Sequence, residues 1–250
     1  MKYLLSLISI LIQFLVSAQN VTAVVSQAQQ LENNMNDEAA VAKYKQAVIL
    51  QPSNIYALCK ASELSSRIAS RYKENPDRQS LFFADAKDYA AKALKVDPQN
   101  SEANFVMAMV MGREAISAGG KDKIMAVKDV KHYADLAVKY DPKNFKAWYI
   151  LGKWYYEVSS LNYIERTAVK VFFGSLPNAT ISDAINCFER AKSISPSFVL
   201  NYLSLAKAYK KKDEEDKAKE NLSVMVALPD QTQDDARLKS EGRSLLKKWN

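Results

Sequence analysis

The stretch Asp141-Pro142-Lys143-Asn144-Phe145-Lys146-Ala147-Trp148-Tyr149-Ile150-Leu151-Gly152-Lys153-Trp154-Tyr155 decides the fold of this chain. A proline turn precedes a helix-length run, and a small residue stands ten positions after the proline. The pattern recurs, because positions ten residues after the first four turn prolines hold Ser62, Ala108, Gly152 and Ala206. The five turn prolines are Pro52, Pro98, Pro142, Pro196 and Pro229. Such spacing indicates an array of stacked helix pairs.

The turns divide the chain into helices, and no stretch alternates polar and apolar residues over the length of a strand. Only 6 glycines occur among the 250 residues, which also favours helix. The expected pairs are Val21–Asn33 with Asp37–Leu50, Ile55–Tyr72 with Leu81–Val96, Ser101–Ala118 with Lys123–Tyr140, a helix from near Asn144 with one from Thr180, and Phe198–Lys211 with Glu214–Leu228. A last helix, Asp234–Trp249, is expected to cap the array.

These offsets resemble the tetratricopeptide pattern, most closely at Trp148, Leu151, Gly152 and Tyr155, followed by Ala184, Phe188, Ala191 and Pro196. The resemblance implies an all-α, right-handed superhelix of about five helix pairs with a C-terminal capping helix. We expect one irregular repeat domain over residues 19–250. The interval from Pro142 to Pro196 holds an apolar insertion at about 161–179, which lengthens that repeat.

From about Asn144 to the C-terminus the chain is similar to the regulator-of-microtubule-dynamics family. The similarity rests on residues 148–158, Ile164-Glu165-Arg166, Leu176-Pro177-Asn178-Ala179-Thr180, Pro196-Ser197-Phe198 and Leu228-Pro229-Asp230. It implies a helical repeat domain without enzymatic activity. In animals the family is associated with microtubules, and one branch tethers endoplasmic reticulum to mitochondria and carries phospholipid in its repeat domain.

The N-terminus has the form of a secretory signal peptide. Lys2 is followed by an apolar run from Leu4 to Val16 and by Ser17-Ala18-Gln19. The run is shorter than the roughly 20 residues that span a bilayer. We therefore predict a signal peptide over residues 1–18 and an exported protein, periplasmic or secreted, with an uncleaved anchor as the alternative. No other transmembrane segment is expected, and export would separate the protein from tubulin.

Composition argues against several classes of function. The single histidine, His132, makes a histidine-based metal site or a catalytic triad improbable, and no cofactor motif stands out. The net charge of +7 comes from lysines interspersed with acidic residues, not from a continuous basic stripe, so nucleic acid is not expected as a partner. Cys59 and Cys187 lie in separate repeats and are expected to pack as small apolar residues.

In tetratricopeptide folds the first helix of each pair lines the concave face, which gives a candidate groove. Its predicted residues are aromatic or cationic: Tyr56, Arg67, Phe105, Arg113, Lys146, Tyr149, Lys153, Tyr156, Lys207 and Lys210. Aromatic faces alternating with cations suit an extended ligand with a carboxylate or phosphate. The alternative is that some of these side chains fill the interior of the superhelix.

The groove predicts a non-enzymatic scaffold that binds a protein or peptide, with a lipid-binding or lipid-transfer module for phospholipid as the alternative. The insertion adds a second question, because Phe172 and Phe173 make it too apolar for a free loop. Either these two residues pack against the convex face or they cover one end of the groove.

Overall fold

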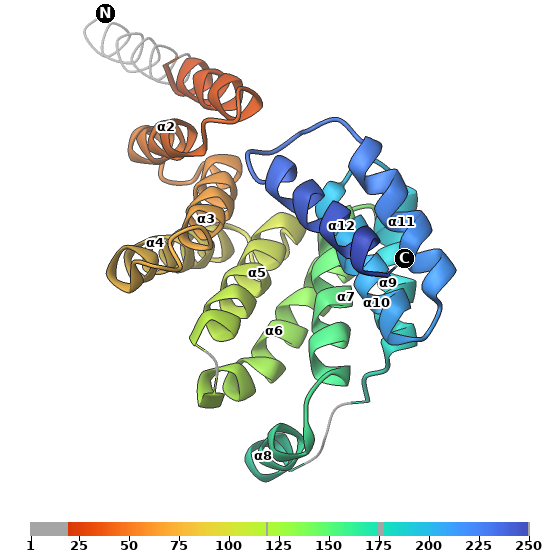
Figure 1. Cartoon of the computed structure of the whole chain (residues 1–250). Coiled ribbons are helices and arrows are strands. Elements are labelled where there is room, and N and C mark those ends of the chain that lie inside the picture. Colours follow the sequence, from red (N-terminus) through yellow and green to blue (C-terminus); the bar gives the residue numbers. More distant parts are fainter. Residues whose placement is uncertain (1–19, 119, 175–177, 250) are drawn as a thin grey trace, which may run out of the picture. The chain divides into compact units, whose positions relative to one another are not determined.

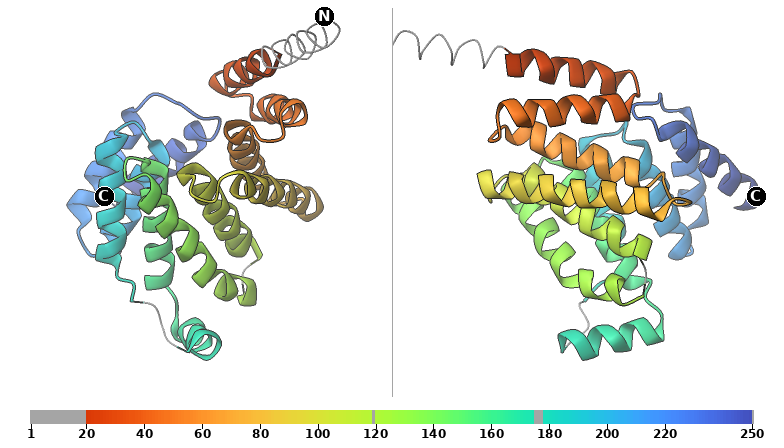
Figure 2. Two further views of the ribbon diagram at one scale, coloured as in Figure 1. Left: turned by 180° about the vertical axis from the view of Figure 1, so that it is seen from behind. Right: turned by 90° about the vertical axis from the view of Figure 1, so that its left-hand side faces the viewer.

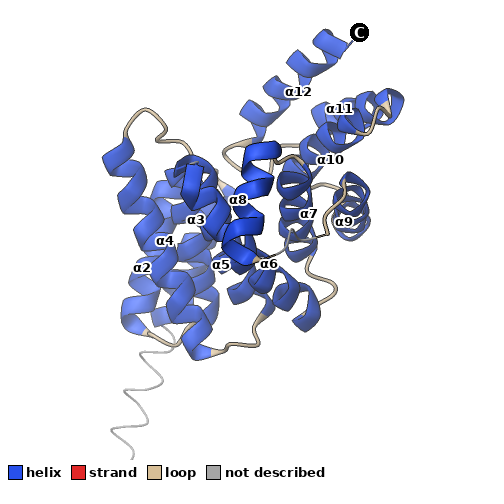
Figure 3. Ribbon diagram, turned by 90° about the horizontal axis from the view of Figure 1, so that it is seen from below, coloured by secondary structure: helices blue, strands red, loops and turns tan. Residues whose placement is uncertain are grey.

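The computed structural model describes residues 20–118, 120–174 and 178–249, and those residues form helices joined by turns, without a strand (Figure 3). Helix 20–33 is followed by α2 (Asp37–Leu50), α3 (Ile55–Ala69), α4 (Pro76–Val96), α5 (Ser101–Ala118), α6 (Gly120–Tyr140), α7 (Phe145–Ser159), α8 (Tyr163–Phe173), α9 (Ile181–Ile194), α10 (Val199–Lys211), α11 (Glu215–Ala227) and α12 (Asp235–Trp249) (Figure 1). The predicted all-α class and its helix pairs are confirmed.

The helices gather into two compact units, which divide between Val96 and Asp97. In the first unit, helix 20–33, α2, α3 and α4 lie side by side (Figure 2, right). In the second unit α5 packs on α6, α7 on α9, and α10 on α11, with α12 against α10 and α11. The insertion becomes a helix of its own, α8, which contacts α6.

The proline turns work through an asparagine two residues after the proline. The side-chain oxygen of Asn54 accepts a hydrogen bond from the Ala57 amide at 3.0 Å, and that of Asn144 accepts from the Ala147 amide at 3.2 Å. Each asparagine thereby satisfies a backbone donor that the first turn of a helix leaves free. The turn therefore ends one helix and starts the next.

The second helices of the first and fourth pairs, α2 and α9, bury small residues around an aromatic one. On α9, Ala184, Phe188 and Ala191 are fully buried, and on α2 Ala40, Tyr44 and Ala47 are as well. Alanines two turns apart let the helix backbones approach, and the aromatic ring between them in the sequence fills the remaining space. The packing pattern visible in the sequence is thus the pattern of the core.

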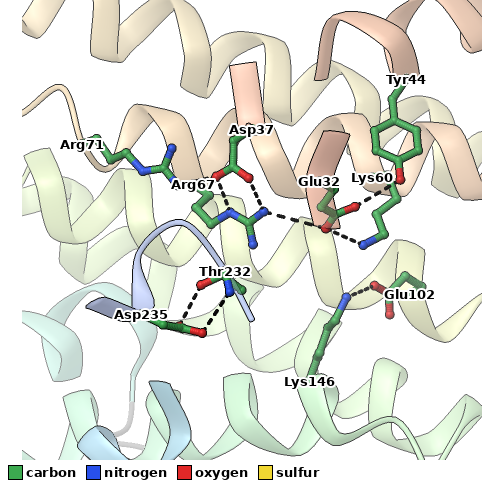
Figure 4. Close-up of polar contacts among 10 residues, drawn as sticks. All are labelled: Glu32, Asp37, Tyr44, Lys60, Arg67, Arg71, Glu102, Lys146, Thr232 and Asp235. Atoms are coloured by element: carbon green, nitrogen blue, oxygen red, sulfur yellow. Dashed lines mark hydrogen bonds and ion pairs between the residues drawn. The ribbon is translucent and has the colours of Figure 1, made fainter. Parts of the chain in front are cut away.

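Several boundaries differ from the sequence prediction: α3 ends at Ala69 and not at Tyr72, α6 begins at Gly120 and not at Lys123, and ends of α9 to α12 shift by one residue. Helix α4 begins at Pro76 and not at Leu81, because a proline is well suited to the first helical position and Asn75 Oδ1 accepts from the Arg78 amide at 3.1 Å. Helix α12 follows a turn that the buried Asp235 carboxylate fixes by accepting from Gln231 N at 2.8 Å and Thr232 Oγ1 at 2.7 Å (Figure 4).

Candidate functional site

The second unit carries a surface on which lysines lie over aromatic rings. We define this cationic–aromatic surface as Lys153 and Tyr156 of α7, Lys207, Lys210 and Lys211 of α10, and Trp249 of α12. Helices α7 and α10 contact each other, and α10 also contacts α12. All but Lys211 and Trp249 belong to the predicted groove, so Lys153 and Tyr156 of the fourth pair lie with Lys207 and Lys210 of the fifth, whereas Lys146 and Tyr149 of the fourth pair lie elsewhere.

Tyr156 is the centre of this surface. The Nζ atoms of Lys153 and Lys211 lie 5.3 Å and 5.6 Å from its ring centroid, within range of a cation–π interaction. Lys211 also donates to Ser160 Oγ, one turn further along α7. The two ammonium groups therefore come from different helices and converge on one half-buried ring.

Lys153 keeps its charge at this site. Burial opposes the charged form of its amine, but the Glu157 carboxylate, 2.7 Å away, outweighs burial, and the pKa of Lys153 is raised above its ordinary value. Burial also raises the pKa of Tyr156, so its phenol stays neutral. The centre of the surface is consequently cationic over the physiological range of pH.

The α12 side of the surface is made of intramolecular pairs. Lys207 Nζ lies 2.6 Å from Glu241 of α12, and Lys210 pairs with Glu215 of α11 while lying 5.7 Å from the Trp249 ring centroid. These pairs are partly exposed, and ion pairs of that kind contribute little to stability. A carboxylate of an acidic ligand could therefore replace Glu241 or Glu215 as the partner of these lysines at a small cost in free energy.

One predicted residue, Lys146, lines a polar cleft of about 550 Å³ between the starts of α5 and α7. Lys146 Nζ pairs there with Glu102 at 2.8 Å and lies 5.4 Å from the ring centroid of Phe105, which is buried (Figure 4). Asp97 and Asp141 also line the cleft. Because acidic residues offset the lysines, this cleft is a poorer site for an anion than the cationic–aromatic surface.

In the first unit Arg67 belongs to a buried ion-pair cluster (Figure 4). Its Nε and terminal nitrogen donate to Asp37 at 2.9 Å and 2.7 Å, and Arg71 pairs with the same carboxylate. Burial favours loss of the guanidinium charge, but the carboxylates of Glu63, Asp37 and Glu32 outweigh it and raise the pKa of Arg67. Arg67 thus joins α2 to α3.

The remaining predicted residues differ in exposure. Tyr149 is buried against Phe188 and Phe198, and Arg113 is half-buried. Tyr56 is 41% exposed, and its hydroxyl accepts from Gln29 Nε2 at 3.0 Å. Phe172 is exposed on α8, and the side chain of Phe173 lies outside the described residues.

Two members of the surface were missed in the sequence. Lys211 stands in the run Lys210-Lys211-Lys212. Positive charge is favourable at the C-terminus of a helix, and this explanation of the run does not require a binding site. The spacing of Lys207, Lys210 and Lys211 is nevertheless that of one helix face, and this signal could have found it. No sequence pattern indicates that Trp249 belongs to this surface, because Trp249 reaches it only through the packing of α12.

No cluster of three or more potential metal ligands occurs among the residues that the structure describes. His132 lies edge-on to Tyr133, with ring centroids 5.2 Å apart. Cys59 and Cys187 are both buried, and they do not form a disulfide with each other. Within the same described residues, none of the helices is both long and apolar enough for a bilayer crossing.

The Cys187 thiol is expected to be unreactive in the folded protein. Burial, reinforced by Asp183, raises the pKa of Cys187 to about 12, so its thiolate form is scarce at pH 8. We expect a thiol reagent at pH 8 to label Cys187 slowly in the native protein and rapidly in guanidinium chloride, as located by peptide mass spectrometry. Rapid stoichiometric labelling of native Cys187 would contradict this picture of the core.

The fold defines the chain as a tetratricopeptide-like helical repeat protein. A thermophilic TPR protein of Thermus thermophilus superposes with a TM-score of 0.64 at 13% identity, over 91% of this chain and 99% of that one. The sequence model described as Regulator of microtubule dynamics protein 1-3 matches residues 24–250. The chain belongs to this family.

Named relatives agree with the family. Regulator of microtubule dynamics protein 1 of Caenorhabditis elegans is 27% identical over 180 residues, which are 69% of this chain and 76% of the relative. Protein 3 of Xenopus laevis is 28% identical over 163 residues, 65% of this chain and 35% of the relative. Protein 2 of Bos taurus is 28% identical over 160 residues, 64% and 39%. The chain therefore spans little more than a third of two of these relatives.

The predicted export, to the periplasm or outside the cell, is wrong. The family and its relatives are named for the regulation of microtubule dynamics, and microtubules are polymers of the cell interior. The interpretation of residues 1–18 as a signal peptide falls on residues outside those that the structure describes.

Proposed function

We propose that the chain is a non-enzymatic scaffold that binds an acidic segment of a protein partner on the cationic–aromatic surface. The observation that carries this proposal is the convergence of Lys153 and Lys211 on Tyr156. Ammonium groups held over a ring can contact carboxylates of a ligand while the ring packs on its apolar atoms. The relatives' names make microtubules, or a protein bound to them, the first partner to test.

The charge of the chain supports an acidic ligand. The surface holds four lysines against the three carboxylates of Glu157, Glu241 and Glu215, and the whole chain carries a net charge of +7. Positive potential of this kind speeds the encounter with an acidic partner, and salt screens it over about 8 Å at physiological ionic strength. Binding should therefore weaken as the salt concentration rises.

Lys153→Glu with Lys211→Glu is expected to weaken binding about tenfold or more, because two attractive charges become repulsive. The measurement is fluorescence anisotropy with a labelled glutamate-rich peptide, together with co-sedimentation with microtubules. The matched control is Lys131→Glu with Lys217→Glu. Like Lys153, Lys131 pairs with an acidic residue four positions later, Asp135, and its Nζ lies 5.5 Å from the ring centroid of Tyr155. Lys217 pairs with Glu214, and its Nζ lies 5.3 Å from the ring centroid of Tyr209.

The control substitutions lower the net charge by the same amount as the test substitutions, but they do so on α6 and α11, the second helices of their pairs. Equal loss in both double variants would show a general charge effect and would refute a site on α7 and α10. Undiminished binding by the Lys153 and Lys211 variant would refute it as well. If the wild type ignores the peptide and microtubules but native mass spectrometry finds a co-purified phospholipid, the lipid-binding function replaces the present one.

A further inference from the structure

Helix α8 presents an apolar face outward. Tyr163 is 84% exposed, Ile164 78%, Val171 76% and Phe172 50%. Thr167 is exposed on the same side of the helix, and its hydroxyl donates to the Tyr163 carbonyl at 2.9 Å. We define the apolar face of α8 as these five residues.

This orientation is fixed by contacts on the opposite side of the helix. Val169 is fully buried, and the Arg166 guanidinium donates to the carbonyls of Leu161 and Ser159 at 3.0 Å and 3.1 Å. The helix is also closed at both ends, by a capping box between Asn162 and Glu165 and by Gly174 in the left-handed conformation. Turning the apolar face inward would break these contacts.

We propose that the apolar face of α8 docks on an anionic lipid surface. Of the three charged residues of α8, helical periodicity places Arg166 on the opposite side, exposed Lys170 at one edge of this face beside Tyr163, and half-buried Glu165 at the other edge beside Phe172. An apolar face bordered by a lysine and a tyrosine is the arrangement of helices that lie in the membrane interface. The net charge of +7 is complementary to anionic headgroups.

The size and place of the helix favour a lipid surface over a second copy of the chain. A helix of 11 residues is about 16 Å long, and one face of it covers far less than the roughly 800 Å² that each partner of a stable dimer contributes. Helix α8 lies at the periphery of the second unit (Figures 1 and 2). A projecting helix needs a groove in a protein partner, whereas a bilayer interface accepts it directly.

The test compares two pairs of exposed apolar residues in the full chain. Ile164→Gln with Val171→Gln removes the centre of the face, and Ile49→Gln with Leu81→Gln is the matched control, because those residues are 79% and 70% exposed on α2 and α4. Partition is measured by co-sedimentation with phosphatidylcholine vesicles that contain phosphatidylglycerol and with pure phosphatidylcholine. The α8 variant is expected to partition into the anionic vesicles about tenfold more weakly, and the control to match the wild type.

A local probe reads the contact separately from any other part of the chain. An environment-sensitive fluorophore on Val171→Cys should shift to the blue with anionic vesicles and much less with neutral ones, while one on Ile49→Cys should not shift. Absence of the shift at position 171 overturns the proposal. So does equal response to both kinds of vesicle, or a vesicle-free dimer in sedimentation that the Ile164 and Val171 substitutions dissociate.

Discussion

Asp37→Ala is expected to lower the free energy of unfolding of the first unit by about 3 kcal/mol. The Asp37 carboxylate is fully buried and accepts from two nitrogens of Arg67, whose side chain is itself only 10% exposed. Without Asp37 the guanidinium stays buried and loses both of its hydrogen bonds to that carboxylate, while Glu32, 3.7 Å away, and Glu63 remain as the acidic groups that act on it. A buried charge that loses its partner is much more costly than a broken surface pair.

Hydrogen exchange read by peptide mass spectrometry provides the measurement, because it assigns the loss to the first unit. Amides of α2 and α3 should exchange roughly a hundredfold faster, since each 1.4 kcal/mol is a factor of ten. Asp88→Ala is the control: Asp88 pairs with Lys92, and both side chains are more than half exposed, at 56% and 52%. Its cost should stay within about 0.5 kcal/mol.

A double substitution separates the value of the pair from the penalty of an orphaned charge. Asp37→Leu with Arg67→Met removes both charges and keeps apolar volume at the site, so it should cost less than Asp37→Ala alone. An equal or larger cost would mean that the ion pair itself, together with the contact of Arg71 to Asp37, stabilises the two helices. Arg67 would then make a net contribution to the stability of the first unit through its ion pair with Asp37.

The fold could be predicted from the sequence because its determinants are local. A proline and an asparagine two residues later set the boundaries between α2 and α3, α4 and α5, and α6 and α7, and alanines seven residues apart mark the buried faces. Helix α8 was missed, although Asn162-Tyr163-Ile164-Glu165 has the form of a capping box. The apolar composition of the insertion concealed this signal.

The site was predictable only in part, because some of the predicted cations pair with carboxylates that are distant in the sequence. Arg67 pairs with Asp37, 30 positions away, and Lys207 with Glu241, 34 positions away. Offsets within a repeat place a lysine or arginine on a helix, but they do not say which carboxylate packs against it. Whether a cation remains available to a ligand is therefore decided by tertiary packing.

Gly152→Ala is expected to lower the free energy of unfolding of the second unit by about 2 kcal/mol. A Cβ atom at this position would lie 2.8 Å from Cδ1 and Cε1 of Phe188 and 3.0 Å from Cβ of Cys187. Phe188 is fully buried and packs on Tyr149, so its ring has no room to retreat. The clash must exceed the gain of up to about 1 kcal/mol that alanine brings to a helix interior.

Gly112→Ala on α5 serves as the control, because it is expected to change the free energy of unfolding in the opposite direction. Its Cβ would meet Val130 Cγ1 at 3.9 Å, an ordinary contact, so helix propensity should stabilise the unit by up to about 1 kcal/mol. Urea unfolding followed by tryptophan fluorescence measures the stability of both variants, because all three tryptophans, Trp148, Trp154 and Trp249, belong to the second unit.

A double variant tests whether the clash with Phe188 is the cause. Gly152→Ala combined with Phe188→Leu should cost less stability than the sum of the two single substitutions, because the smaller side chain at position 188 relieves the contact. Additive costs in that double variant would place the strain elsewhere, and a stabilising Gly152→Ala would show that α7 and α9 can separate without penalty.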